Sequence, residues 1–153
     1  GRFTGEPAYF RHVAECAQEL MSTMGMEAKD FKYAVFHQPN LKFPSSMGKK
    51  LGFKEEQLSP GLLIPEIGNS YSASSLLGLT ATLDVSEPED RVLIVSYGSG
   101  AGSDAFQLKV NDDIVNFKEM RDSRGIRNTS SYVEERELLD YSIYAKYSGR
   151  YRR

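Results

Sequence analysis

Apolar side chains near the start of the chain recur with a helical period. They are Phe10, Val13, Ala14, Ala17, Leu20, Met21 and Met24. Spacings of three and four residues place apolar side chains on one face of an amphipathic helix. Thr4 can cap such a helix, Pro7 favours its first turn and Gly25 can end it. We therefore predict a helix over residues 5–24.

Shorter apolar runs further along the chain predict β-strands. They cover residues 31–36, 62–64, 92–96 and 105–110. Runs of this length bounded by turn residues are typical of strands, and we expect the last two to pair with each other. Helices are predicted between these strands over residues 44–51, 54–58 and 70–85, with Gly52 ending the first of them. The helix at 70–85 is rich in small residues and has low intrinsic propensity, so we expect it to be buried and held by packing.

The pattern is less regular beyond residue 110. Residues 118–131 are polar and predict a loop. Tyrosines recur at helical spacing over residues 132–151, which predicts a helix whose aromatic face packs on a partner or on the core. Helices alternating with strands predict an α/β domain with a layered, mixed sheet, and 153 residues are enough for one core.

Charge and composition exclude several classes of protein. The net charge of −2 argues against a general nucleic-acid binder. No apolar run approaches the roughly 18 residues that span a bilayer, and the start of the chain lacks the layout of a signal peptide. The single cysteine allows no internal disulfide and fits a cytoplasmic protein. Because the chain begins with Gly1, we expect a fragment or a processed product.

His37 is the principal candidate for chemistry because it follows a predicted strand and precedes the turn at Pro39 and Asn40. Histidine titrates near neutral pH, and a strand end fixes its ring more firmly than a loop does. The alternative is a histidine that only hydrogen-bonds to the backbone. His12 lies near the charged face of the first predicted helix, which indicates a solvated surface residue.

Other residues have structural and functional interpretations. Asn69 follows Gly68 at the start of a predicted helix, where asparagine is often an N-cap. Residues 100–105 formally fit a dinucleotide fingerprint, but a strand rather than a helix follows the loop, so we predict a tight turn at residues 98–102. Cys16 lies between alanines, which predicts a buried core thiol. Lys49 and Lys50 are expected on a solvated helix face, whereas Lys42 is a candidate for binding phosphate.

Several stretches together resemble the archaeal type of hydroxymethylglutaryl-CoA synthase, a family in the thiolase superfamily. The similar stretches are residues 4–10 (TGEPAYF), 36–40 (FHQPN), 67–72 (IGNSYS), 95–106 (VSYGSGAGSDAF) and 138–141 (LLDY). The resemblance extends over nearly the whole chain. It implies the fold of a thiolase-like C-terminal half over residues 1–153, a layered mixed sheet with a buried helix.

The same resemblance implies an acyltransferase of the mevalonate pathway that condenses acetyl-CoA with acetoacetyl-CoA. In that family the nucleophilic cysteine and a glutamate acid/base belong to the N-terminal half, which this chain lacks. His37 would bind and protonate the acetoacetyl carbonyl, and Asn69 would support it. Ser99 and Tyr71 would line the substrate site, and Lys42 and Thr4 would contact coenzyme A. The resemblance implies coenzyme A thioesters as substrates, with no metal and no resident cofactor.

The expected partners are the N-terminal half of the same enzyme, a second copy, an acetoacetyl-CoA thiolase and a zinc-containing bridging protein. The chain alone is expected to be inactive. Two alternatives remain open: an acyl-CoA-binding or assembly subunit that retained the fold, and half of a condensing enzyme similar to ketoacyl-ACP synthases.

Overall fold

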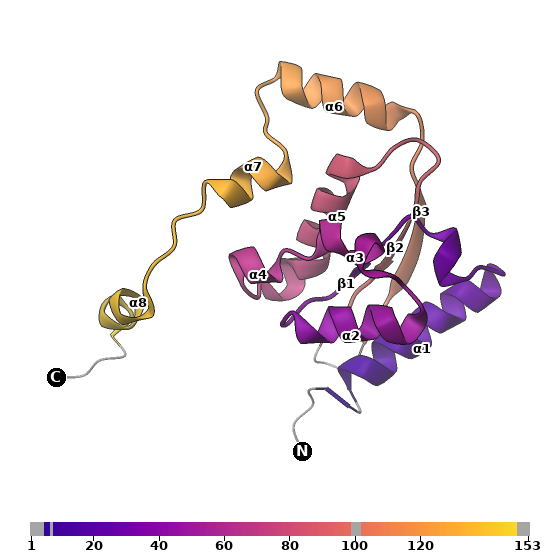
Figure 1. Cartoon of the computed structure of the whole chain (residues 1–153), viewed down its shortest axis with the longest axis horizontal. Coiled ribbons are helices and arrows are strands. Elements are labelled where there is room, and N and C mark those ends of the chain that lie inside the picture. Colours follow the sequence, from indigo (N-terminus) through magenta and orange to yellow (C-terminus); the bar gives the residue numbers. More distant parts are fainter. Residues whose placement is uncertain (1–4, 7, 99–101, 150–153) are drawn as a thin grey trace.

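The computed structural model describes residues 5–6, 8–98 and 102–149. Its centre is a three-stranded sheet in the order β1-β2-β3, made of Tyr33–Phe36, Arg91–Val95 and Ala105–Lys109 (Figure 1). β1 runs parallel to β2, and β3 runs antiparallel to β2. The predicted mixed sheet and the predicted pairing of the last two strands are confirmed.

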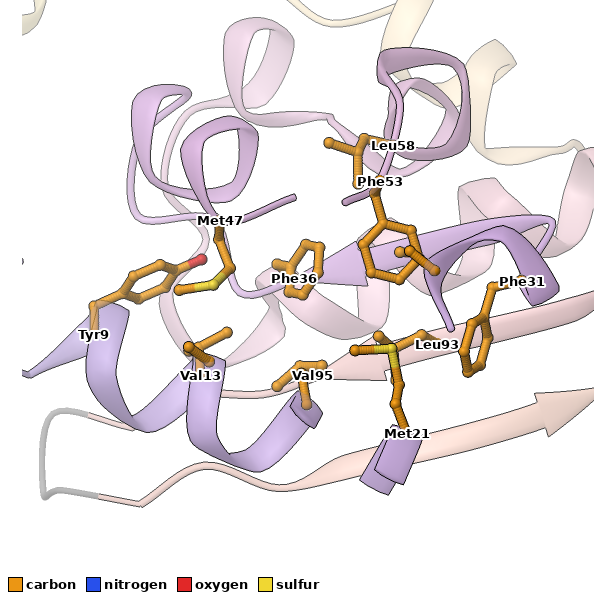
Figure 2. Packing of buried hydrophobic residues seen from close by; sticks show 14 residues of the cluster. Tyr9, Val13, Met21, Phe31, Phe36, Met47, Phe53, Leu58, Leu93 and Val95 are labelled. Carbon is orange, nitrogen blue, oxygen red and sulfur yellow. The ribbon is translucent and has the colours of Figure 1, made fainter. Parts of the chain in front are cut away.

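Three helices cover one face of the sheet: α1 (Tyr9–Thr23), α2 (Lys42–Leu51) and α3 (Glu55–Leu58). Because strand side chains alternate between faces, Phe36 and its register partner Val95 both point toward these helices. Figure 2 shows them packed among Tyr9, Val13 and other apolar side chains. α1 ends before Gly25, whose φ of +63° suits glycine. The first predicted helix is thus confirmed over most of its length.

Helix α5 (Ser74–Val85) covers part of the other face of the sheet, where Val35 and Ile94 pack with Leu79 and Leu83. A single turn of 3₁₀ helix, η3 (Tyr71–Ala73), precedes α5, so the α-helix begins at Ser74 rather than at residue 70. Its small side chains line the buried side: Ser74, Ser75, Gly78, Ala81 and Thr82. Its other side is open, with Leu76 62% exposed, so the helix is only half buried.

The predicted strand at 62–64 is wrong. The chain there leaves the turn η2 (Ser59–Gly61) and enters the short helix α4 (Ile64–Ile67). Pro65 lies in the first turn of α4, where its lack of an N–H is tolerated. The N–H of Ile64 donates to Oε1 of Gln38 at 2.9 Å, so a buried side chain takes the place of a neighbouring strand.

The predicted loop over 118–131 is wrong except at residues 124–128, because α6 (Asp113–Ser123) and the start of α7 (Thr129–Glu134) occupy the rest of it. Polar contacts hold much of α6 in place: Nζ of Lys118 donates to the carbonyl of Ser86 at 2.6 Å, and Arg121 pairs with Asp84. Ile114 adds an apolar contact at the start of the helix. Polar contacts do not require apolar residues at helical spacing, so the sequence carries no periodic pattern that predicts this helix.

The tyrosine-rich segment forms α7 and a separate helix, α8 (Tyr141–Tyr147), rather than one long helix. Asn128 and Asp140 cap the two helices by accepting from the N–H groups of Ser131 and Ser142. Tyr147 is 81% exposed, so this aromatic face does not pack on the core of the chain. In Figure 1, α8 lies apart from the sheet and its helices.

One further turn of 3₁₀ helix, η1 (Ala28–Asp30), joins α1 to β1. Among the described residues, no helix is both long and apolar enough to cross a bilayer.

Candidate active site

The backbone of His37 is fixed from two sides. Its N–H donates to the carbonyl of Val95 at 2.9 Å, which extends the parallel pairing of β1 with β2 by one residue. Its carbonyl accepts from the hydroxyl of Tyr9 at 2.7 Å, so α1 holds the same residue. The expectation that a strand end would position this histidine is met.

The ring of His37 is half buried and is held by a serine. Its Nδ1 lies 2.7 Å from Oγ of Ser74, the first residue of α5. The rings of Tyr9 and Tyr97 flank it, with centroids 6.4 and 6.0 Å away. Burial lowers the pKa of His37 from its ordinary value of 6.5. The imidazole is therefore neutral at neutral pH and carries one N–H donor and one bare nitrogen.

Gln38 locks the strand end to the elements around it. The side chain is 2% exposed. Its Nε2 donates to the carbonyl of Gly61 at 2.7 Å, and its Oε1 accepts from the N–H of Ile64. Its own N–H donates to Oγ of Ser74 at 3.3 Å. Neither Gln38 nor Ser74 was identified from the sequence as part of the site. Gln38 directly follows His37 in the sequence, and a polar residue at the end of an apolar strand was a signal for a buried hydrogen-bonding role.

A hollow of about 600 Å³ adjoins the ring of His37. Three groups of residues line it. Ser72, Ser75, Leu76 and Leu79 come from η3 and α5, Ile94, Phe106 and Leu108 from the sheet, and Ser96, Tyr97, Gly98, Gly102 and Asp104 from the connection between β2 and β3. The lining therefore combines apolar side chains with polar groups, His37 among them. This arrangement can hold a small acyl group with its carbonyl toward the imidazole.

Asn69 and Tyr71 lie outside the lining of this hollow. Oδ1 of Asn69 accepts from the N–H of Tyr71 at 2.8 Å, which closes a local turn. Asn69 therefore does not cap α5, and both side chains are exposed. Tyr71 adopts a φ of +52°, a left-handed conformation that is unfavourable for a bulky residue. Their roles in binding and catalysis stay predictions.

The candidates for coenzyme A and substrate contacts are less well defined by the structure. Lys42 begins α2, is exposed, and does not line the hollow. Thr4 and Ser99 lie outside the described residues. The N–H of Gly98 donates to the carbonyl of Gly102 at 2.9 Å, and β3 follows. This segment thus connects two strands, and a dinucleotide-binding helix is excluded after it, while residues 99–101 of the predicted tight turn lie outside the described residues.

Two residues of α1 differ from expectation. Cys16 is only partly buried, and its thiol donates to the carbonyl of Ser103 at 3.3 Å. Burial raises the pKa of Cys16, so the thiol is a weak nucleophile at neutral pH. His12 is half buried rather than fully solvated, with its ring 6.4 Å from that of Tyr97. Within the described residues, no cluster of three or more His, Cys, Asp or Glu side chains could hold a metal ion.

Comparison with known proteins identifies the family to which this fold belongs. Residues 21–110 match the family model of the C-terminal domain of 3-oxoacyl-[acyl-carrier-protein] synthase III, and the chain belongs to that family. The expected fold, a thiolase-like C-terminal α/β domain, is confirmed.

Within this family, the chain is similar to particular curated proteins. The chain is 52% identical over 152 residues to a hydroxymethylglutaryl-CoA synthase of Methanothermobacter thermautotrophicus and 53% identical over 147 residues to one of Archaeoglobus fulgidus. These matches cover 99% and 96% of the chain but only 42% and 41% of the two relatives. The resemblance to the C-terminal portion of the archaeal-type synthases is thus confirmed.

A solved structure supports the fold at lower sequence similarity. A hydroxymethylglutaryl-CoA synthase from Bacillus subtilis superposes with a TM-score of 0.66 at 20% identity, over 88% of this chain and 38% of that one. At this identity the superposition establishes the fold alone.

Proposed function

We propose that this chain is the C-terminal part of a hydroxymethylglutaryl-CoA synthase and supplies the histidine side of its active site. The carrying observation is His37, which is held at a strand end beside an acyl-sized hollow in a chain about half identical to such synthases. The nucleophilic cysteine and the glutamate acid/base would come from an N-terminal part. Acetyl-CoA and acetoacetyl-CoA would be the substrates, and the chain alone would be inactive.

His37 would act on the carbonyl oxygen of the acetoacetyl group. Its Nδ1 is engaged by Ser74, so Nε2 is the ring nitrogen that can reach a ligand in the hollow. A hydrogen-bond donor aimed at an oxygen that gains negative charge in the transition state typically contributes about 100- to 1,000-fold in rate. Cys16 would not serve as the nucleophile, because its thiol is bonded to the carbonyl of Ser103 and its pKa is raised.

The hollow is open on one side, which supports the requirement for a second part. Leu76 and Phe106 line it and are 62% and 56% exposed. Exclusion of water strengthens the electrostatic interactions within an active site. We propose that the N-terminal part covers these side chains and brings its cysteine opposite His37.

The remaining candidate residues have roles within the same proposal. Asn69 would support the carbonyl oxygen once the covering part reshapes the exposed turn, and Ser99 and Tyr71 would line the substrate site. Lys42 and Thr4 would contact coenzyme A. A second copy, an acetoacetyl-CoA thiolase and a zinc-containing bridging protein stay the expected partners, and the cytoplasm stays the expected location.

Complementation tests this proposal. The chain is mixed or co-expressed with the N-terminal portion of the Methanothermobacter thermautotrophicus synthase, and release of coenzyme A from acetyl-CoA and acetoacetyl-CoA is measured. We expect turnover only with both parts present. His37→Ala should lower kcat by about 100- to 1,000-fold, while His12→Ala, at the only other histidine, serves as the matched control. Turnover by the chain alone would contradict the proposal.

A second candidate function follows from the matched family, which is described by a 3-oxoacyl-[acyl-carrier-protein] synthase. In this case the complemented protein would transfer its acetyl group to a malonyl thioester on a carrier protein, with loss of CO₂, instead of to acetoacetyl-CoA. The same assay with malonyl-carrier protein as second substrate distinguishes the two. Binding of acetyl-CoA without turnover, unaffected by His37→Ala, would instead favour the acyl-CoA-binding subunit.

A further inference from the structure

Ser74 is as firmly held as the histidine it contacts. Its side chain is 2% exposed, and its Oγ accepts from the N–H of Gln38 at 3.3 Å. Its carbonyl accepts from Nε2 of Gln38 at 3.4 Å. Since Gln38 is itself bonded to Gly61 and Ile64, the position of the Ser74 hydroxyl is set by four segments of the chain.

The hydrogen-bond inventory of this hydroxyl determines where its proton goes. A serine hydroxyl has one hydrogen to donate and two lone pairs that accept. The N–H of Gln38 can only donate, so it uses a lone pair of Oγ. Among the described residues, Nδ1 of His37 is the remaining partner of Oγ, at 2.7 Å. The serine hydrogen is satisfied only if it points at Nδ1.

Helix geometry favours the same arrangement. Ser74 is the first residue of the 12-residue helix α5, so Nδ1 of His37 lies beside the N-terminal end of that helix. The N-terminal end of a helix carries partial positive charge, which favours a bare ring nitrogen over a protonated one. A proton on Nδ1 would instead face the helix end and leave the serine hydrogen without an acceptor.

We propose that Ser74 is a positioning residue that fixes His37 as the neutral tautomer with its proton on Nε2, facing the hollow. Its catalytic consequence rests on the proposed function. A neutral ring with its only proton on Nε2 is suited to a hydrogen bond with a carbonyl oxygen. Complete transfer of that proton would leave an imidazolate, so this histidine stabilises the oxygen through a hydrogen bond as it gains charge and does not act as a general acid.

The tautomer can be measured on the chain itself. The chain contains two histidines, so a long-range ¹H–¹⁵N spectrum of labelled protein gives two ring patterns, which a His12→Gln variant assigns. At about pH 7.5, one unit above the ordinary histidine pKa, we expect the Nδ1 shift of His37 in the range of a bare acceptor and Nε2 in the range of a protonated nitrogen. The reverse pattern, or equal populations, overturns the proposal.

Variants separate the role of the hydroxyl from that of the fold. Ser74→Ala should shift the ring pattern of His37 toward a mixture of tautomers, and Ser74→Thr, which keeps a hydroxyl, should restore it. Ser86→Ala is the matched control, because Ser86 is also buried with its hydroxyl bonded within α5, to the carbonyl of Thr82. Its His37 pattern should be unchanged. A dispersed amide spectrum verifies that each variant is folded, and an unchanged pattern in folded Ser74→Ala overturns the proposal.

Activity of the complemented protein gives a second readout. Ser74→Ala should lower kcat roughly 5- to 10-fold, the usual contribution of one hydrogen bond, with little change in KM for acetyl-CoA. Absence of turnover in the unmodified complemented protein would count against the proposed function alone, because the spectrum of His37 does not depend on it. Turnover with kcat equal for Ser74→Ala and the unmodified chain would overturn the catalytic consequence.

Discussion

At the scale of single residues, the end of strand β1 fixes both the position and the protonation state of the His37 side chain. Its backbone is bonded to Val95 and Tyr9, and its ring is bonded to Ser74. The same packing that fixes the ring also removes part of its hydration, which disfavours the charged form and lowers the pKa. Position and protonation state therefore have one common cause.

The lowered pKa of His37 predicts how folding stability depends on pH. The unfolded chain binds a proton at His37 near pH 6.5, whereas the folded chain binds it only at lower pH. Below pH 6.5 the unfolded state therefore holds more protons, and the free energy of unfolding falls as the pH is lowered. Urea unfolding at about pH 7.5 and about pH 5.5, on either side of the ordinary histidine pKa, measures this loss.

Substitution isolates the contribution of His37 to that loss. His37→Gln should show a smaller drop between the two pH values than the unmodified chain, while His12→Gln should keep most of it. An identical drop in the His37→Gln variant would show that other groups cause the acid sensitivity.

At the scale of elements, α5 lies so close to its neighbours that a side chain cannot be added at Gly78. A Cβ there would lie 2.8 Å from the carbonyl oxygen of Gly61 and 2.8 Å from Cγ1 of Val35. Gly78→Ala should therefore destabilise the fold by roughly 1–3 kcal/mol, as overpacking of a core usually does. Thr80→Ala, at an exposed position of the same helix, should change stability by less than about 0.5 kcal/mol. Urea unfolding of both variants checks this, and equal stabilities would contradict it.

A second element-level feature is the attachment of α6 and α7 to α5 through one carboxylate. Asp84 pairs with Arg121 of α6, and its Oδ2 accepts from the N–H of Thr129 at 2.7 Å. The side chains of Asp84 and Arg121 are only 19% and 13% exposed, so the loss of this charge leaves a poorly hydrated guanidinium.

We expect Asp84→Asn to loosen both helices, at a cost of about 1–3 kcal/mol. Amide hydrogen exchange should accelerate over residues 113–134, with little change in the sheet. Asp122→Asn is the control, because Asp122 also contacts Arg121 but is 67% exposed. Equal exchange in the two variants would rule out Asp84 as the attachment point.

At the scale of the whole molecule, the chain exposes more surface than a compact protein of its mass. Its accessible area is 10033 Å², whereas a compact protein of this mass would expose roughly 7,800 Å². Apolar side chains near α8 contribute to the difference, since Leu138 and Leu139 are 78% and 66% exposed. Exposed apolar surface of this extent is typical of a face that another protein part covers.

Deletion of residues from 138 onward tests the importance of that face. Because Leu138, Leu139 and Tyr147 are largely exposed, the urea midpoint of the remaining chain should change little. Binding to the N-terminal portion of the Methanothermobacter synthase, measured by calorimetry, should weaken. Unchanged affinity would exclude the α8 region from that interface, and a large loss of stability would show that it supports the fold.

Predictions from the sequence were right where a local pattern or a short motif determines the structure. They were wrong where polar contacts between distant segments determine whether a residue lies in a helix, a strand or a loop. α1, α2 and the pairing of β2 with β3 follow from apolar periodicity and from glycines at the helix ends. Residues 62–64 have the composition of a strand yet enter a helix, because the carboxamide of Gln38 binds the N–H of Ile64. α6 has no apolar stripe and is held mainly by Lys118 and Arg121, with one apolar contact from Ile114.

The sequence by itself determined the family, the layered α/β architecture and the choice of His37, because these depend on periodicity and on short motifs. Only the tertiary structure could show that Ser74, 37 positions away along the chain, sets the ring of that histidine. It also showed Asn69 in an exposed turn of its own. The physical reason is that a hydrogen bond between distant segments depends on how helices and strands pack, and the identity of either residue alone does not encode that packing.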